Sequence, residues 1–140
     1  QAEMLPRFEN NVSLNREKTD EWGMPTLDID CAYGENELAM NKDIGVVMQE
    51  MLQAGGFKQI NVWDNGSNPG IGIHEVGTAR MGRDPKTSML NEWNQLHAVK
   101  NVFVTDGASL PSQGCQNPSL TFMALTARAV DYAVGMYLGN

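Results

Sequence analysis

The chain has 140 residues, of which 41% are hydrophobic and 19% charged, and its formal net charge is −7. This composition is typical of one globular domain with a real core and excludes a disordered chain. There is no run of basic residues, so nucleic acid and anionic membranes are not expected as partners, and no apolar run approaches the roughly 20 residues that span a bilayer.

The first half of the chain predicts a small antiparallel sheet and one helix. Residues 8–14 are expected to form a strand, residues 16–20 a charged turn, and residues 26–33 a second, half-exposed strand in which apolar and acidic side chains alternate. Asn36 is a suitable N-cap for a helix that ends at Gly55-Gly56. We expect this helix to cover the sheet.

The middle of the chain is rich in turn residues. Residues 57–63 predict a short strand or an extended run, and residues 64–70 form either a plain surface loop or a mobile rim over a site. Residues 72–82 are extended and punctuated by glycines, which would let the backbone come close to a flat ligand. This last run places one histidine, His74, among small residues.

The end of the chain predicts a strand, a loop and a helix. The strand covers residues 102–104 and breaks at Asp106-Gly107; Asn117 is a good N-cap, and Pro118 suits the first helical position. A helix N-terminus carries unpaired N–H groups and the positive end of the dipole, so it can receive an anionic or electron-rich ligand atom. The tally of elements is α+β.

His74 and Asn117 are the candidates for reactive positions. An imidazole with an ordinary pKa near 6.5 exchanges protons at neutral pH, and an asparagine can donate to and accept from one hydroxyl. The alternative for His74 is a structural histidine bonded to a backbone carbonyl. His97 has no small-residue context and is interpreted as structural.

No metal site is expected. The pair His74-Glu75 lacks a second histidine four positions after the first, since position 78 is Thr78. Asp28 and Asp30 are typical of alternating surface acids on a strand, without a third ligand at useful spacing. A metal hydrolase built on these two acids and His74 is the weakest of the hypotheses.

Two motifs resemble the glucose–methanol–choline (GMC) family of flavin oxidoreductases. The first is HEVGTARMG at residues 74–82, and the second combines NVFVTDGASLP at residues 101–111 with NPSLTFMALTA at residues 117–127. They stand in the family's order and about forty residues apart, as in the family. The pattern is most similar to the pyranose oxidase, glucoside dehydrogenase and choline dehydrogenase branches.

The resemblance implies a role for each matching residue. His74 corresponds to the family's active-site histidine, which faces the reactive edge of the flavin, and Asn117 to its second active-site residue. Asp106 and Gly107 correspond to the pair beside the ribityl and diphosphate part of FAD. The start of the last helix, which approaches the pyrimidine end of the ring, corresponds to Pro118, Ser119 and Thr121.

The resemblance also implies an organisation and a reaction. Residues 1–100 would belong to the substrate-binding domain, an antiparallel sheet covered by helices, and residues 101–140 would close the Rossmann-like FAD-binding domain. The chain begins at Gln1 and has no glycine-rich nucleotide loop, so we expect a fragment that lacks the N-terminal FAD-binding part. The full-length enzyme would pass hydride from a CH–OH group of an alcohol or sugar to flavin N5, with His74 as base.

The fragment itself is expected to be inactive, to lack FAD and to self-associate. The alternative function is a non-catalytic module that binds carbohydrate or protein through the rim at residues 64–70. Trp22 or Trp63 could stack on a sugar ring, or could equally be core residues. Cys31 and Cys115 leave the compartment of a soluble protein open between cytoplasm and periplasm.

Overall fold

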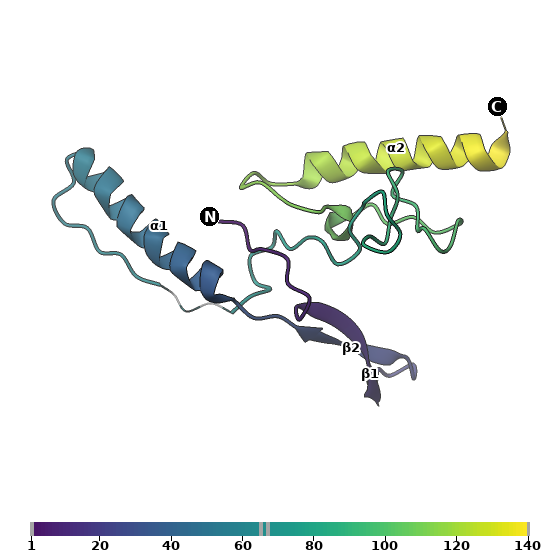
Figure 1. Ribbon diagram of the computed structural model, residues 1–140, viewed down its shortest axis with the longest axis horizontal. Coiled ribbons are helices and arrows are strands. Elements are labelled where there is room, and N and C mark those ends of the chain that lie inside the picture. The colour runs from purple at the N-terminus through teal and green to yellow at the C-terminus, as the bar shows by residue number, and fades with distance from the viewer. Residues whose placement is uncertain (1, 65, 67, 140) are drawn as a thin grey trace. The chain divides into compact units, whose positions relative to one another are not determined.

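The structure is a computed structural model that describes residues 2–64, 66 and 68–139. The elements in chain order are β1 (Asn11–Thr19), β2 (Pro25–Asp30), α1 (Glu35–Ala54), the 3-10 helix η1 (Gly107–Ser109) and α2 (Ser119–Leu138), as Figure 1 shows. The chain divides into two compact units, an N-terminal unit (Gln1–Ile71) and a C-terminal unit (Gly72–Asn140).

Strands β1 and β2 form an antiparallel hairpin whose register follows the sequence alternation. Val12 pairs with Ile29 and Leu14 with Leu27, so the four apolar side chains share one face of the ribbon. On the other face, Asn15 donates its Nδ2 hydrogen to Asp28 Oδ1 at 2.8 Å. The predicted pairing of two amphipathic strands is confirmed.

The turn of the hairpin lies later than predicted. Residues 16–19 belong to β1, and the connection is made by residues 20–24. The Oδ1 atom of Asp20 accepts the N–H groups of Trp22 and Met24, both at 2.9 Å, and Gly23 adopts φ 80°. The carboxylate of Asp20 therefore sets the position of the turn. The run of charged residues before Asp20 does not determine where the turn lies.

The predicted cover of the sheet by a helix is wrong for this chain. The four apolar side chains of the hairpin are 42–71% exposed, and no other pair of elements within the described residues packs as β1 and β2 do. A lone hairpin with one apolar face needs a further layer to bury it. Helix α1, in the same unit, does not supply that layer.

Two further runs do not form strands: residues 57–63, which were predicted as a short strand or an extended run, and residues 102–104. Residues 57–63 form no strand, and in the run 102–104 only Phe103 pairs, through an isolated antiparallel bridge to Gln95. Both runs have apolar residues suited to a sheet. Residues 102–104 have only a short antiparallel neighbour: the Leu96 N–H bonds the Val102 carbonyl at 3.0 Å and the Val104 N–H bonds the Asn94 carbonyl at 2.9 Å. Asn94 has φ 61°, outside the range of a strand, so the pairing does not extend further.

Helix α1 begins two residues earlier than predicted. Its N-cap is Gly34 and not Asn36, because the carboxylate of Glu37 reaches back and accepts the Gly34 N–H at 2.8 Å. The other oxygen of Glu37 accepts the Leu5 N–H at 3.1 Å. The predicted end is confirmed, since the Gly55 N–H bonds the Met51 carbonyl at 3.0 Å.

The buried carboxylate of Glu37 ties the N-terminal segment to α1 in a charge-dependent way. The Leu5 N–H holds the pKa of Glu37 below its usual value against the opposing effect of burial, and the Gly34 N–H adds to the lowering. A carboxyl group whose pKa is lowered by folding stabilises the fold above its unfolded pKa. That stabilisation is lost as the pH falls through the lower, folded pKa.

We therefore expect the attachment of the N-terminal segment to weaken on acidification. An NMR titration should give Glu37 a midpoint below 4.5, with faster exchange of the Leu5 amide at lower pH. Glu37→Gln should weaken the attachment at neutral pH and remove its acid dependence. Glu35→Gln, in the same first turn but not bonded to Leu5, is the matched control. A midpoint at or above 4.5 would contradict the assignment.

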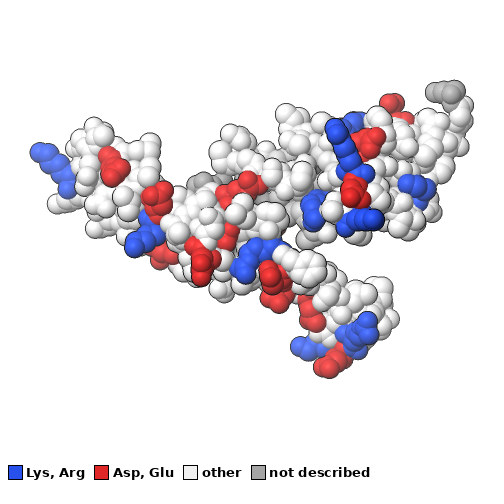
Figure 2. All heavy atoms as spheres, in the orientation of Figure 1, with Lys and Arg blue, Asp and Glu red and all other residues white. Residues whose placement is uncertain are grey.

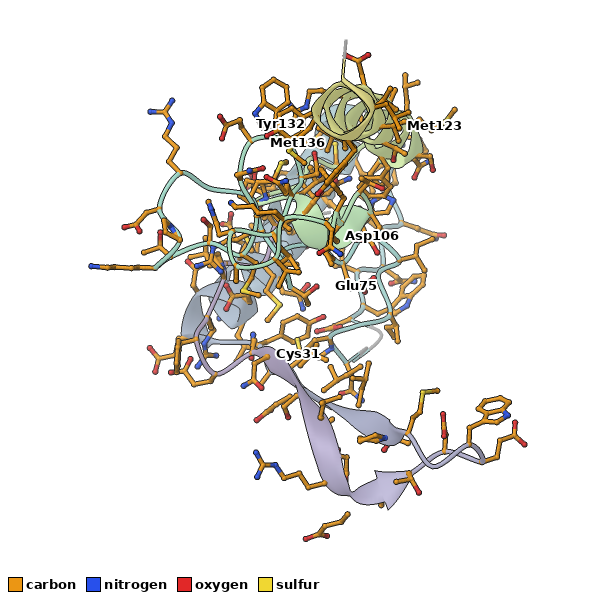
Figure 3. All side chains as sticks on the ribbon, turned by 90° about the vertical axis from the view of Figure 1, so that its right-hand side faces the viewer. Cys31, Glu75, Asp106, Met123, Tyr132 and Met136 are labelled. Atoms are coloured by element: carbon orange, nitrogen blue, oxygen red, sulfur yellow. The ribbon has the colours of Figure 1, made fainter. Side chains whose placement is uncertain are left out.

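In the C-terminal unit, α2 packs on the loop that residues 93–104 form. The ring of Tyr132 stacks on Trp93 with centroids 4.8 Å apart and meets Phe103 edge-on at 6.4 Å. Figure 3 places Tyr132 and Met136 on one side of α2 and Met123, which is exposed, on the other. The helix thus has one face packed on its own unit and one apolar face that is exposed among the described residues of that unit.

Asn94 holds this loop in a conformation that other residue types rarely adopt. It is buried with φ 61°, donates Nδ2–H to the Val104 carbonyl at 2.9 Å and accepts from Arg128 at 3.3 Å. The guanidinium of Arg128 also lies 5.9 Å from the Trp93 ring centre. These contacts fix α2 against the segment that precedes η1.

The surface is charged but mixed. Figure 2 shows basic and acidic side chains interspersed on the visible face. Within the part of the chain that the structure describes, neither helix has the length and apolar character needed to cross a bilayer.

Candidate functional site

The two motifs that resemble the GMC family lie side by side in the C-terminal unit. Backbone N–H groups at alternate positions of the first motif bond successive carbonyls of η1, joining Gly77 to Gly107 at 3.3 Å, Ala79 to Ala108 at 2.9 Å and Met81 to Ser109 at 2.9 Å. Segments about thirty residues apart in sequence are thereby aligned. These three hydrogen bonds hold the motif that contains His74 beside η1, which follows the predicted strand.

Gly107 lies where the backbone of the first motif crosses η1. A β-carbon at this position would lie 2.9 Å from the Glu75 carbonyl oxygen and 3.3 Å from Phe122 Cζ. Only glycine permits so close an approach of backbone to backbone. Asp106 precedes it and caps η1, since its Oδ1 accepts the Ala108 N–H at 3.0 Å. Both predicted cofactor residues therefore shape this crossing.

His74 and Asn117 meet directly. The His74 Nε2 atom lies 2.9 Å from Asn117 Oδ1, although 43 positions separate the two residues. His74 is half-buried and Asn117 is exposed, so the pair is open to a ligand. If Nε2 carries the proton it donates to the amide oxygen; in the other tautomer the amide NH₂ would donate to Nε2.

The bond to His74 explains why α2 starts differently from the prediction. The expected N-cap was Asn117 with Pro118 as first helical residue, whereas the helix begins at Ser119 with Pro118 as N-cap. The side-chain oxygen of Asn117 is engaged by the imidazole and not by a helix N–H. The difference of one residue thus has a physical cause.

The tip of α2 is left with open donors. Within the described residues no side chain caps this end, and the first helical bond runs from the Phe122 N–H to the Pro118 carbonyl at 3.0 Å. The N–H groups before Phe122 include those of Ser119 and Thr121, which are both exposed. The seven predicted site residues, His74, Asp106, Gly107, Asn117, Pro118, Ser119 and Thr121, all belong to the C-terminal unit.

His97, the other histidine, has a different environment. Its Nε2 atom lies 3.1 Å from Ser88 Oγ and 3.2 Å from the Gly82 carbonyl. The Ser88 hydroxyl donates its proton to the Asp84 carbonyl at 2.8 Å, so the serine oxygen accepts from His97. His97 holds a loop together, as predicted, and is not placed beside Asn117.

Sequence reasoning did not single out Glu75 as a site residue. Its carboxylate accepts the Gly72 N–H at 2.8 Å and closes the turn that presents His74. An acidic residue next to a histidine is a weak signal without the three-residue spacing back to a glycine. That spacing is the one local signal for this bond, and it does not reveal the positive φ of Ile73 on which the turn depends.

The other candidate regions belong to the N-terminal unit. Two surface hollows, of about 820 and 470 Å³, lie there and are not lined by His74 or Asn117. The smaller one includes Asp64 of the predicted rim, which accepts from Asn41 at 2.6 Å; Asn65 and Ser67 of that rim lie outside the described residues. Among the described side chains there is no group of three that could hold a metal ion.

Comparison with known proteins gives relatives along nearly the whole chain. The chain is 39% identical over 133 residues to 2-methyl-1,2-propanediol dehydrogenase of Mycolicibacterium austroafricanum. The aligned region covers 94% of this chain and 24% of the relative. The chain is 32% identical over 130 residues to paromamine 6'-oxidase of Streptomyces fradiae (93% and 24%). It is 28% identical over 134 residues to the fructose dehydrogenase large subunit of Gluconobacter japonicus (92% and 23%).

The chain therefore spans about a quarter of the length of these relatives. A family model described as GMC oxidoreductase, covering the family's C-terminal domain, matches residues 6–126. This match covers most of the chain, including the first motif and all but the last residue of the second, and confirms the resemblance. The chain belongs to the GMC oxidoreductase family.

Proposed function

We propose that this chain is the C-terminal part of an FAD-dependent oxidoreductase that oxidises CH–OH groups of alcohols or sugars. The observation that carries the proposal is the 2.9 Å contact between His74 Nε2 and Asn117 Oδ1. Relatives named as a propanediol dehydrogenase and a fructose dehydrogenase support a hydroxylated substrate. In this proposal residues 1–100 contribute to the substrate domain and residues 101–140 to the FAD domain.

The residues at the tip of α2 fit the cofactor. A flavin has carbonyl acceptors on its pyrimidine ring, and the uncapped end of α2 offers backbone donors with Ser119 and Thr121 among them. Gly107 gives a backbone surface without a side chain, and Asp106 fixes its conformation. We assign these residues and Pro118 to flavin binding, and the flavin, when bound, supplies the acceptor for the hydride.

His74 is assigned as the base. Oxidation of an alcohol removes a hydride from carbon and a proton from oxygen, and His74 takes that proton at Nε2. For this the substrate hydroxyl replaces the Asn117 amide at Nε2, while the single proton of the neutral imidazole lies on Nδ1. The half-buried position of His74 limits the water that competes for the same nitrogen.

Asn117 is assigned to hold the same oxygen. Its NH₂ group can donate to the substrate oxygen as negative charge develops there, and this stabilises the alkoxide. Because the two side chains are already in contact, a small separation is enough for one substrate oxygen to bind between them. Their main contribution is positioning of the reacting carbon.

One observation favours the alternative of a binding module. Trp22 and Trp63 are 75% and 79% exposed in the N-terminal unit, so they are not core residues of this chain. Exposed indoles can stack on sugar rings. A colourless complete protein that binds carbohydrate would favour this function, whereas the His74–Asn117 contact supports oxidation.

The proposal is tested on the complete enzyme that contains this chain. We expect a yellow protein whose flavin is bleached without oxygen by an alcohol or sugar, and a survey of diols, pyranoses and aminoglycosides would identify the substrate class. Bleaching should require a CH–OH group, so the corresponding deoxy compounds are the matched controls. A complete protein without flavin, or one whose flavin no such compound reduces, would overturn the proposal.

A further inference from the structure

The turn that presents His74 contains a residue in an unfavourable conformation. Ile73 has φ 56°, in the left-handed region that a β-branched side chain rarely adopts. Its side chain is 86% exposed, so packing within the chain does not force this conformation. Something else must hold the turn closed in the orientation that brings His74 to Asn117.

Glu75 makes the hydrogen bond that closes the turn. Its Oε1 atom accepts the Gly72 N–H at 2.8 Å, across the two residues that lie between them. Within the described residues this is the one hydrogen bond that joins the two ends of residues 72–75. A bond from N–H to a carboxylate is stronger than one between neutral groups.

The backbone of Glu75 is held from the other side. Its carbonyl oxygen lies against Gly107, only 2.9 Å from where a β-carbon would be. Figure 3 shows Glu75 and Asp106 close together on neighbouring segments. Glu75 thus links the turn before it to the rigid crossing at η1, and His74 lies between these two attachments.

We propose that Glu75 is a positioning residue that sets the orientation of the His74 imidazole. The inference rests on the proposed function, because it assigns Glu75 to the same reaction. It acts through the length and acceptor oxygen of its side chain, which reach the Gly72 N–H. Without this bond Ile73 relaxes to negative φ, and the imidazole leaves the position where it meets Asn117.

Two variants of the complete enzyme distinguish the effect of the length of the Glu75 side chain from the effect of its charge. Glu75→Gln keeps an acceptor at the same distance and removes the charge, whereas Glu75→Asp keeps the charge and is one methylene shorter. We expect Glu75→Gln to retain most of kcat and Glu75→Asp to lose about tenfold, because small misplacements of a reacting group are costly. KM should change less than kcat, and Glu92→Gln, an exposed glutamate of the same unit, should change neither.

A second variant tests the strain at Ile73. Asparagine tolerates positive φ better than isoleucine, so Ile73→Asn should restore much of the kcat lost in Glu75→Asp. If Glu75→Asp does not retain flavin, the double variant takes its place: recovered flavin and turnover support the proposal, and continued failure overturns it.

Failure of the positioning role of Glu75 and failure of the proposed function give different experimental results. The proposal is overturned if Glu75→Asp matches the wild type, or if Glu75→Gln falls as far as Glu75→Asp. His74→Ala is measured beside them. A wild-type enzyme whose flavin no CH–OH compound reduces removes the proposed function itself, and a fully active His74→Ala removes His74 from the mechanism. An inactive His74→Ala with a fully active Glu75→Asp removes only the positioning role.

Discussion

Replacing His74 with alanine in the complete enzyme should lower turnover by about 10²–10⁴-fold and leave FAD bound. In the proposed mechanism the side chain is the proton acceptor, and its Nε2 atom lies 2.9 Å from the Asn117 amide that would hold the same substrate oxygen. Removal of the His74 side chain leaves the three hydrogen bonds from Gly77 to Met81 intact, because these bonds use backbone atoms only. Steady-state turnover, with flavin absorbance per protein as the measure of cofactor content, distinguishes lost chemistry from lost binding.

The other histidine provides the matched control. His97→Ala removes an imidazole that bonds Ser88 Oγ and the Gly82 carbonyl and therefore should lower the melting temperature with little change in kcat. The two variants should show opposite patterns, one of lost turnover and one of lost stability. Unchanged turnover in His74→Ala would remove this residue from the mechanism.

The 140-residue chain expressed alone should self-associate and show no turnover with added FAD. Its accessible surface is 11096 Å² for a mass of 15.4 kDa. A compact protein of this mass exposes about 7,200 Å², and two separate compact bodies of half the mass expose about 8,700 Å² together. The excess includes apolar side chains of the hairpin and of α2 that need a further layer.

Light scattering after size-exclusion chromatography measures the association, and alcohol-dependent bleaching of added FAD measures the activity. Ile29→Lys should reduce association because it places a charge on the apolar face of the hairpin, whereas Ser13→Lys lies on the opposite face and should not. A monomeric chain that oxidises an alcohol would contradict both expectations.

Local signals in the sequence predicted the hairpin well. The alternation of Leu27 and Ile29 with two acids determined which side chains share a face, and the register confirms it. The position of the turn was missed because the Asp20 carboxylate bonds two backbone N–H groups beyond it. The start of α1 was missed for a similar reason, since Glu37 caps Gly34 from inside the helix.

Interactions between distant residues were less predictable. Motif spacing pointed to both His74 and Asn117, but no local rule showed that their contact would displace the N-cap of α2 to Pro118. The run at residues 102–104 has the composition of a strand and forms only one bridge, because strand formation depends on a partner. Glu75 was missed because its role depends on the φ of Ile73, which sequence does not reveal.

The proposed mechanism requires His74 and Asn117 to act on one substrate oxygen. The most direct measurement is the rate at which substrate bleaches the bound flavin without oxygen in the wild type, His74→Ala, Asn117→Ala and the double variant of the complete enzyme. Residues that act as a unit give non-additive losses, so the double variant should be little slower than His74→Ala alone. Losses that multiply independently, or bleaching at the wild-type rate in both single variants, would contradict a shared site.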